Sequence, residues 1–335
     1  MTSGTIAKRE PFFRRLINRH FRIGLAFVVM LVLLTINASL NPRFFSPPSI
    51  TSTANQSMTL VFAGMAQTSV VLTGGIDLSN GSIIGLTNSL ASSLFTTSVP
   101  GGIAVIVLVL VAGILCGLIN GSIVVYGRLQ PLIVTLATAS VYDGIALYIR
   151  PTPGGFVPDW YSTALTQRIF GVLPASLVLL VLVILIVWTP FRRSQLGMWV
   201  YAVGSNEDAA YISGINTNRA KLAAYGLGGL LAAIAGLFLT AQTQSGNANS
   251  LFAGLFTLRS IAVVVMGGTL LIGGSGGIAG TIAGAFSLRM ISGILFFANV
   301  NPLQQTFWEG AILLFAVIAG GGRVFSIKNR LDAWR

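Results

Sequence analysis

The sequence is poor in the side chains from which enzymes build active sites. Only 8% of its 335 residues are charged, and it holds one cysteine, Cys116, and one histidine, His20. A single cysteine excludes an intrachain disulfide, and no cluster of His and Cys is present to bind a metal. The three lysines, Lys8, Lys221 and Lys328, lie in no Gly-x-x-x-x-Gly-Lys-Ser/Thr sequence, so a P-loop for ATP is excluded. We therefore expect no catalytic site, metal or cofactor in this chain.

Hydrophobic residues, in contrast, make up 54% of the chain. A soluble domain carries about 25% charged residues, so this chain cannot cover a water-facing surface of ordinary size. Several apolar runs are long enough to cross a bilayer. We predict an all-α, polytopic membrane protein of about ten transmembrane helices, at residues 23–40, 56–73, 82–98, 102–126, 131–149, 170–189, 222–242, 256–272, 277–297 and 306–322.

The net charge of +12 reflects topology and does not indicate nucleic-acid binding. With these spans, 15 of the 20 Lys and Arg residues fall on the side of the N-terminus, as the positive-inside rule requires of the cytoplasmic side. Both termini are therefore predicted to be cytoplasmic. The expected domains are a basic tail (1–22), a transmembrane domain (23–322) with a cytoplasmic loop at 190–221, and a second tail (323–335).

Two glycine-containing segments, residues 70–82 and 263–275, resemble each other. Aligned without gaps they share seven of thirteen residues, including the pairs Gly74-Gly75 and Gly267-Gly268. Internal repeats are typical of transporters, and their broken helices line the substrate pathway. Small residues also let helices pack closely, which is the structural alternative for these glycines.

The first of these segments carries Asp77, a carboxylate in an apolar environment. An unpaired charge in lipid costs about 2.5 kcal/mol or more, so Asp77 must face a partner, free N–H groups or water. It is predicted either to organise the pathway or to cap the following helix. Residues 56–98 fit a hairpin, or one helix broken near the middle of the membrane, because non-helical backbone is tolerated there only where it lines a cavity.

Polar side chains within the predicted spans are candidate ligands for a neutral sugar or polyol. These are Asn55, Gln56, Gln67, Thr68, Asn88, Asn120, Thr135 and Thr138, and the pathway also includes Thr73 and Ser79 of the first glycine segment. Each has an alternative role as a hydrogen-bonding contact between helices.

The long inner loop contains a second candidate site, Glu207, Asp208, Ala209 and Ala210, followed by Gly214. A solvated amphipathic helix is the usual explanation of such a charged run. Because the chain has little other cytoplasmic surface, we predict instead a short helix that docks onto a partner.

Several motifs together resemble the permease subunits of ribose-type sugar ABC importers. They are Thr73-Gly-Gly-Ile-Asp-Leu-Ser-Asn-Gly-Ser82, Gly117-Leu-Ile-Asn-Gly121, Gln130-Pro-Leu-Ile-Val-Thr-Leu136, the run from Gly197 to Ala210, and Ile261-Ala-Val-Val-Val-Met-Gly-Gly-Thr269. The resemblance implies a bacterial inner-membrane permease that moves a monosaccharide or related polyol by alternating access.

The same resemblance implies the partners. They are cytoplasmic ATPase subunits that bind ATP and Mg²⁺, a periplasmic sugar-binding protein, and a second permease copy or a paralogue, all within membrane lipid. It also implies that Glu207 to Gly214 receives the motion of the ATPase. An ion-coupled secondary transporter is the rival interpretation, but it predicts several intramembrane acids where only Asp77 and Asp143 qualify. A passive channel leaves the acidic loop without a role.

Two positions depart from the family pattern. Asp143-Gly144 stands where the family has Arg-Gly, and Thr257-Leu258-Arg259 stands where it has Glu-Leu-Asp. An acid and a base have thus changed places, so we predict an ion pair between Asp143 and Arg259. Contact between the two side chains is the test of this prediction.

Overall fold

A computed structural model describes residues 12–301, 304–305, 307–312 and 314, with side chains from residue 23 onward. Within these residues the chain is mostly helical, as predicted, with one two-stranded hairpin. The predicted tail at 323–335 and most of the predicted span at 306–322 lie outside the described residues, as do the first eleven residues of the tail at 1–22.

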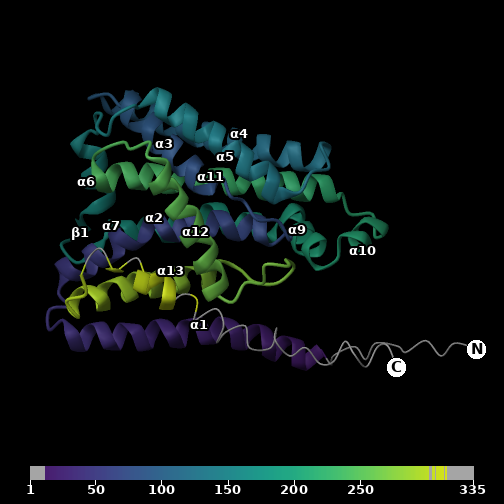
Figure 1. The fold of residues 1–335 in the computed structure, drawn as a ribbon, viewed down its shortest axis with the longest axis horizontal. Helices are drawn as coiled ribbons and strands as arrows, with labels where there is room; N and C mark the ends of the chain where they lie inside the picture. Colours follow the sequence, from purple (N-terminus) through teal and green to yellow (C-terminus); the bar gives the residue numbers. More distant parts are fainter. Residues whose placement is uncertain (1–11, 302–303, 306, 313, 315–335) are drawn as a thin grey trace, which may run out of the picture.

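The long helices run along one axis of the molecule and form a bundle (Figure 1). They are α1 (Phe12–Leu40), α2 (Pro47–Val71), α4 (Val99–Tyr126), α5 (Pro131–Ile149), α11 (Thr217–Thr243) and α13 (Ile278–Phe297), together with the continuous helical run of α7 (Ala175–Val183), the π-helix η1 (Ile184–Trp188) and α8 (Thr189–Arg193). The π-helix precedes Pro190, which lacks the N–H needed for regular helical pairing.

Short elements close the two ends of the bundle (Figure 1). At one end lie α9 (Gln195–Ser205) and α10 (Glu207–Ile212), and we call this the α10 end. At the other lie α6 (Asp159–Thr166) and the hairpin of β1 (Arg168–Ile169) and β2 (Leu173–Pro174), and we call this the α6 end. Helix α1 starts at the α10 end and finishes at the α6 end.

Helix α11 is the centre of the bundle. Of its most apolar window 78% is buried, against 11% for α1, so α11 is enclosed by protein while α1 lies at the periphery. Its closest neighbour is α4, where a Cβ on Gly113 would lie 2.6 Å from the Gly229 carbonyl oxygen. Small residues allow this backbone contact, which is typical of helix packing in membranes.

Six helical segments are long and apolar enough to cross a membrane: 23–40, 99–126, 131–149, 175–193, 217–243 and 278–297. Each overlaps a span predicted from the sequence. The predicted spans at 56–73, 82–98 and 256–272 correspond to α2, α3 (Asn80–Leu94) and α12 (Ser250–Met266). These three are more polar or shorter than a usual span, so the total of about ten crossings stays a prediction.

The segment between α2 and α3 turns back into the bundle. Helix α2 ends at Val71, yet the Asn80 side chain at the start of α3 donates a hydrogen bond to the Ala63 carbonyl at 2.9 Å. Ala63 lies eight residues before the end of α2, or about 12 Å at 1.5 Å per residue. Residues 56–98 are thus a full-length helix, a re-entrant segment at 72–79 and a short returning helix.

Candidate functional site

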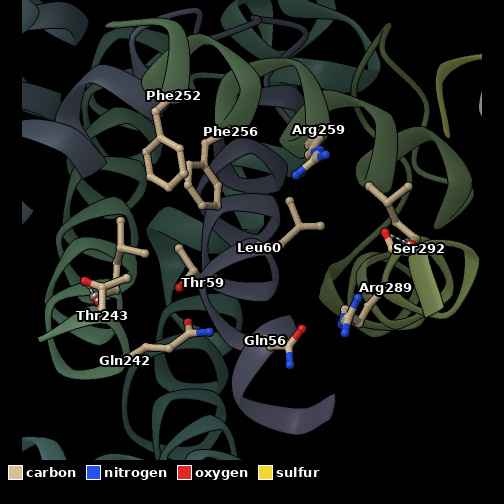
Figure 2. Close-up of a pocket in the computed structure, with 12 residues that line it drawn as sticks. Gln56, Thr59, Leu60, Gln242, Thr243, Phe252, Phe256, Arg259, Arg289 and Ser292 are labelled. Carbon is tan, nitrogen blue, oxygen red and sulfur yellow. Dashed lines mark hydrogen bonds between the residues drawn. The ribbon is translucent and has the colours of Figure 1, made fainter. Parts of the chain in front are cut away.

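A pocket of about 310 Å³ opens between α2, α11, α12 and α13, near the α6 end (Figure 2). Each helix contributes the part that lies toward this end: Gln56, Thr59 and Leu60 from α2, Leu239, Gln242 and Thr243 from α11, Phe252, Phe256 and Arg259 from α12, and Leu288, Arg289 and Ser292 from α13. One site is therefore formed by three consecutive helices and by α2, which is distant from them in the sequence.

The lining of the pocket combines two aromatic rings with amides and hydroxyls. Phe252 and Phe256 lie one helical turn apart and pack edge to face, with ring centroids 4.9 Å apart. Gln56 and Gln242 project from the facing helices (Figure 2). Amides can donate and accept at once, and an aromatic face accommodates the C–H groups of a sugar ring. The chemistry suits a small, hydroxyl-rich molecule.

Two arginines also line the pocket, and one of them forms an ion pair. Arg259 Nη2 lies 2.7 Å from Glu309 Oε2, while Ser292 Oγ donates to Glu309 Oε1 at 2.6 Å. Glu309 is buried and Arg259 is half-buried. The contact links α12 to the chain after α13, and the serine satisfies the second carboxylate oxygen.

The predicted ion pair between Asp143 and Arg259 is not formed. Arg259 faces Glu309, whereas Asp143 lies beside the Ser82 hydroxyl of α3. The physical reason is the packing of the helices. Helix α5 packs against α3 and α4, whereas α12 packs against α2, α3 and α13, and Arg259 lies on the side of α12 where Ser292 of α13 and Glu309 are found. The sequence comparison identified an altered charge at residue 259 but not its partner.

Asp77 lies inside the bundle on the re-entrant segment, with 3% of its surface exposed. Its Oδ1 accepts hydrogen bonds from Ser79 N at 2.8 Å and Ser79 Oγ at 2.6 Å. Helix α3 has Ser79 as its N-cap, with no side-chain cap hydrogen bond. Asp77 therefore shapes the turn that leads into α3 and does not cap the helix itself.

A chain of hydrogen bonds connects this turn to α4 and α5. Asn120 Nδ2 donates to Ser79 Oγ at 2.7 Å, and Asn120 Oδ1 accepts from the Tyr142 hydroxyl at 3.0 Å. The Leu78 N–H donates to Thr135 Oγ1 at 2.9 Å. These side chains satisfy non-helical backbone away from water, where an unpaired group costs several kcal/mol (about 2–7). Asn120, Thr135 and Ser79 thus hold the re-entrant segment.

On the α2 side, the amide of Gln67 faces the backbone of Asp77. With its nitrogen toward the Asp77 carbonyl, it donates at 2.9 Å and accepts from the Asp77 N–H at 3.2 Å. The Asp77 main chain is thereby paired as it would be in a β-ladder. Gln67 is fully buried. Of its two predicted roles, ligand for a sugar or contact between segments, these hydrogen bonds fit the contact.

The two glycine segments of the repeat meet each other at the α10 end. The Gly274 N–H donates to the Leu72 carbonyl at 3.0 Å, and a Cβ on Gly74 would lie 3.1 Å from the Ile272 carbonyl. Gly204 of α9 packs on the same two groups, since its Cβ would lie 1.9 Å from Leu72 O and 2.5 Å from Gly274 N. We call the backbone contact of Leu72, Gly204 and Gly274 the glycine junction.

The helix-terminating glycines are not the ones that the gapless alignment pairs. Gly74 after α2 has φ +82°, and Gly268 after α12 has φ +78°. The alignment matches Gly74 with Gly267 instead. Gly267 has an ordinary φ and packs closely on Gly280 of α13. One glycine of each pair therefore has a conformational role, and Gly267 has a packing role.

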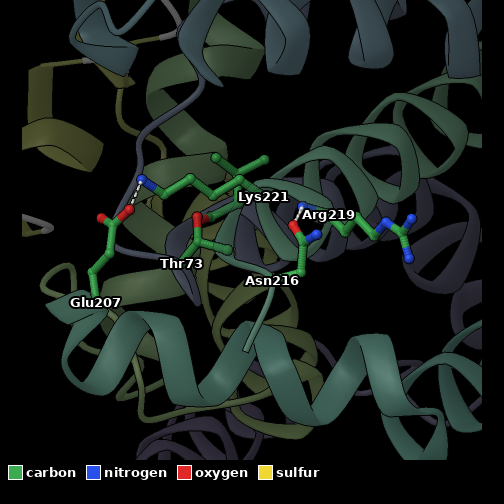
Figure 3. Close-up of polar contacts among 6 residues, drawn as sticks. Thr73, Glu207, Asn216, Arg219 and Lys221 are labelled. Atoms are coloured by element: carbon green, nitrogen blue, oxygen red, sulfur yellow. Dashed lines mark hydrogen bonds and ion pairs between the residues drawn. The ribbon is translucent and has the colours of Figure 1, made fainter. Parts of the chain in front are cut away.

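Helix α10 is held to the start of α11 by an ion pair between Lys221 Nζ and Glu207 Oε1 (Figure 3). Asn206 caps α10 by accepting from the Ala209 N–H at 2.9 Å. Ala210 is buried beneath the helix, while Tyr211 and Ile212 are 72% and 85% exposed. The helix thus presents an apolar pair at the end of the bundle.

The predicted site residues fall into five separate places. Gln56 lies in the pocket, Asp77, Ser79, Asn120 and Thr135 lie in the re-entrant network, and Thr73, Gly74, Gly75, Gly267 and Gly268 lie at the turns near the α10 end. Asn55 donates to the Thr166 carbonyl at 2.7 Å and anchors α6. Glu207, Asp208, Ala209 and Ala210 lie in α10, and Gly214 lies just after it, with φ +79°.

Most residues of the pocket were missed by sequence reasoning. Gln242, Thr243, Phe252, Phe256, Arg289 and Ser292 belong to three helices that come together only in the fold. The one usable signal was the spacing of Phe252 and Phe256, which places both rings on one helical face. Within the described residues no group of three or more His, Cys, Asp or Glu side chains is placed to hold a metal ion.

Comparison with known proteins identifies a family of similar sequences. Residues 49–318 match the family described as branched-chain amino acid transport system / permease component. The ribose import permease protein RbsC of Haemophilus influenzae is 33% identical over 88% of this chain and 91% of its own length. The RbsC protein of Bacillus subtilis is 34% identical over 87% of this chain and 90% of its own.

A relative with a different named substrate is also similar. The autoinducer 2 import system permease protein LsrD of Escherichia coli O157:H7 is 29% identical over 94% of this chain and 95% of its own length. No solved structure matches the chain.

Proposed function

Because the chain belongs to this family of transport permeases, we propose that it is the membrane-spanning subunit of an ABC importer for a monosaccharide or related polyol. The named relatives import ribose and autoinducer 2, which supports a small, hydroxyl-rich cargo. The expected partners are cytoplasmic ATPase subunits, a periplasmic sugar-binding protein and a second permease, in a bacterial inner membrane.

The observation that carries the proposal is the pocket between α2, α11, α12 and α13. It pairs the Phe252 and Phe256 rings with the amides of Gln56 and Gln242, and its volume of about 310 Å³ is at the small end for ligand sites. Pathways in transporters are lined by polar groups enclosed by helices, with irregular backbone nearby. Substrate enters here from the α6 end.

The charge distribution supports this orientation. Arg128, Arg192, Arg193, Arg219 and Lys221 lie at the α10 end, where α1 also starts with Arg14, Arg15, Arg19 and Arg22 in its first turns. Arg43, Arg150 and Arg168 lie at the α6 end. An excess of basic residues marks the cytoplasmic side. The α10 end therefore faces the ATPase, and the α6 end faces the binding protein.

The glycine junction supplies a route from α10 to the pocket. Helices α9 and α10 pack together, and Gly204 of α9 contacts both the end of α2 and the loop between α12 and α13. Helices α2, α12 and α13 contribute Gln56, Phe256 and Arg289, respectively, to the lining of the pocket. Movement of α10 by the ATPase is passed through backbone contacts to three of the four helices around the substrate, which is the basis of alternating access.

The proposal is tested by transport in vesicles that contain this permease, its ATPase and its binding protein. Vesicles are screened with radiolabelled pentoses, hexoses, hexuronates and C4–C6 polyols. For the transported substrate, we expect Phe256→Ala to lower ATP-dependent uptake about tenfold, which corresponds to about 1.4 kcal/mol. Leu258→Ala is the matched control, since Leu258 is on the same helix and 64% exposed.

Two results would contradict the proposal. Equal uptake by the Phe256→Ala and Leu258→Ala variants would exclude the pocket as the substrate pathway. Uptake by this chain alone, driven by a sodium or proton gradient and indifferent to ATP, would identify an ion-coupled transporter instead.

A further inference from the structure

The pocket of the proposed permease carries more positive than negative charge. Arg259 and Arg289 both line it. The structure describes six acidic residues. Asp77 binds Ser79, Asp143 lies beside Ser82, Asp159 starts α6, and Glu207 and Asp208 start α10, so none of these five lines the pocket. Glu309 is the one described acid at the pocket.

Glu309 is already occupied by other donors. Its Oε2 accepts from Arg259 Nη2 at 2.7 Å and its Oε1 accepts from Ser292 Oγ at 2.6 Å. Arg289 therefore forms no ion pair with any acid of the described chain. The Nε atom of Arg289 is buried and has no hydrogen-bond partner among the described residues.

An unpaired guanidinium among transmembrane helices is costly and marks a functional site. The Arg289 side chain points into the pocket, where Gln56 faces it from α2 (Figure 2). Guanidinium groups bind carboxylate and phosphate by two parallel hydrogen bonds, and these charged contacts are about twice as strong as neutral ones. The missing partner of Arg289 therefore has the chemistry of an oxyanion.

We propose that the substrate is an anionic monosaccharide, and that Arg289 determines this specificity by binding its acidic group. The inference rests on the proposed function, since it names the substrate class of the same pocket. The Phe252 and Phe256 rings hold the sugar ring, the amides of Gln56 and Gln242 bind its hydroxyls, and Arg289 binds the carboxylate or phosphate. Glu309 attracts Arg289 electrostatically, but its hydrogen bonds go to Ser292 and Arg259, which leaves the Arg289 guanidinium available to the substrate.

Saturation-transfer NMR on the full chain in lipid nanodiscs tests the inference, because it detects weak binding. The probes are D-galacturonate, D-galactose 6-phosphate and the neutral D-galactose. We expect both anions to bind at least tenfold more tightly than galactose, and the tighter of the two identifies the acidic group. Arg289→Gln should remove this preference, and Arg289→Lys should retain part of it.

Arg219→Gln is the control, since Arg219 is an exposed cation at the α10 end. It should leave all three affinities unchanged. Residual binding of galactose by Arg289→Gln shows that the variant is folded. If galactose binds wild type as well as the anions do, the inference is refuted and the proposed function survives. If no probe binds wild type, the inference is refuted, and the uptake screen with pentoses, hexoses and polyols decides the proposed function. If Phe256→Ala binds all probes like wild type, the pocket is not the sugar site and both fail.

Discussion

Replacing Gly204 with alanine should weaken the contact between α9 and the two glycine segments. The added Cβ would lie 1.9 Å from the Leu72 carbonyl oxygen and 2.5 Å from the Gly274 nitrogen. Both atoms belong to the backbone, so neither can rotate away. Ordinary van der Waals contact begins at 3.4 Å, so α9 must move away from the Leu72 carbonyl by more than ~1 Å. Separation also strains the 3.0 Å hydrogen bond from Gly274 N to Leu72 O.

The steric clash and the weakened hydrogen bond set the size of the expected loss of stability. Overpacking costs about 1–3 kcal/mol, and the weakened hydrogen bond costs about 1 kcal/mol. Alanine regains about 1 kcal/mol over glycine within a helix. The net destabilisation is therefore about 1–3 kcal/mol, because the steric term exceeds the gain in helix propensity.

Thermal unfolding of the purified protein, followed by loss of the monodisperse gel-filtration peak, measures the effect. At about 3 °C per kcal/mol the midpoint should fall by about 3–9 °C. Gly254→Ala is the matched control, since Gly254 lies within α12 and a Cβ there meets no atom within 4 Å. Its midpoint should stay unchanged or rise slightly. Equal midpoints for the two variants would refute the reasoning.

Two further predictions concern the α10 end and the ion pair. Ile212→Ser should reduce recovery of the ATPase with the tagged permease several-fold, because Ile212 is 85% exposed on α10. The control Phe170→Ser changes a residue that is 99% exposed at the α6 end and should leave recovery unchanged. Equal recovery with the two variants would exclude α10 as the docking helix. In a double-mutant cycle of Arg259→Met and Glu309→Met, we expect a coupling energy of about 1 kcal/mol in thermal stability, since solvent screens a side chain that is 37% exposed; a coupling indistinguishable from zero would show that the pair contributes no stability.

The helical class and the family could be predicted because they depend on local features of the chain. The run at 102–126 is apolar over a length that spans hydrocarbon, and α4 occupies 99–126. The motif from Thr73 to Ser82 identified the permease family that the comparisons then showed. Segments with weak hydropathy were harder, since α2 starts nine residues before the predicted span at 56–73 and its polar residues conceal its length.

The role of Asp77 shows where sequence reasoning ended. A carboxylate two residues before Ser79 fits both a cap and a ligand for substrate. Gln67 of α2 pairs with the Asp77 backbone, and Asn120 of α4 binds Ser79, the residue whose hydroxyl and N–H donate to Asp77. No spacing in the sequence relates these helices. Only contacts between these elements could decide between a cap and a ligand. In the structure Asp77 accepts hydrogen bonds from Ser79 and forms the turn before α3.

The altered charge at Arg259 shows the same limit. The sequence identified an exchanged pair of charges and paired Arg259 with the nearest changed acid, Asp143. Helix packing instead brought Glu309 within 2.7 Å. Which charges form an ion pair depends on their distance in the folded protein, and that distance cannot be read from their positions in the sequence.

By itself the sequence determined that this protein is a helical membrane permease, because hydrophobic length and family motifs are properties of consecutive residues. The tertiary structure alone decided which residues share a site. It brought Gln56, Gln242, Phe256 and Arg289 from four helices to one pocket, and it joined Leu72, Gly204 and Gly274 in one backbone contact. The physical reason is that helix packing, governed by side-chain volume and backbone hydrogen bonding over the entire bundle, sets the positions of groups that lie far apart along the chain.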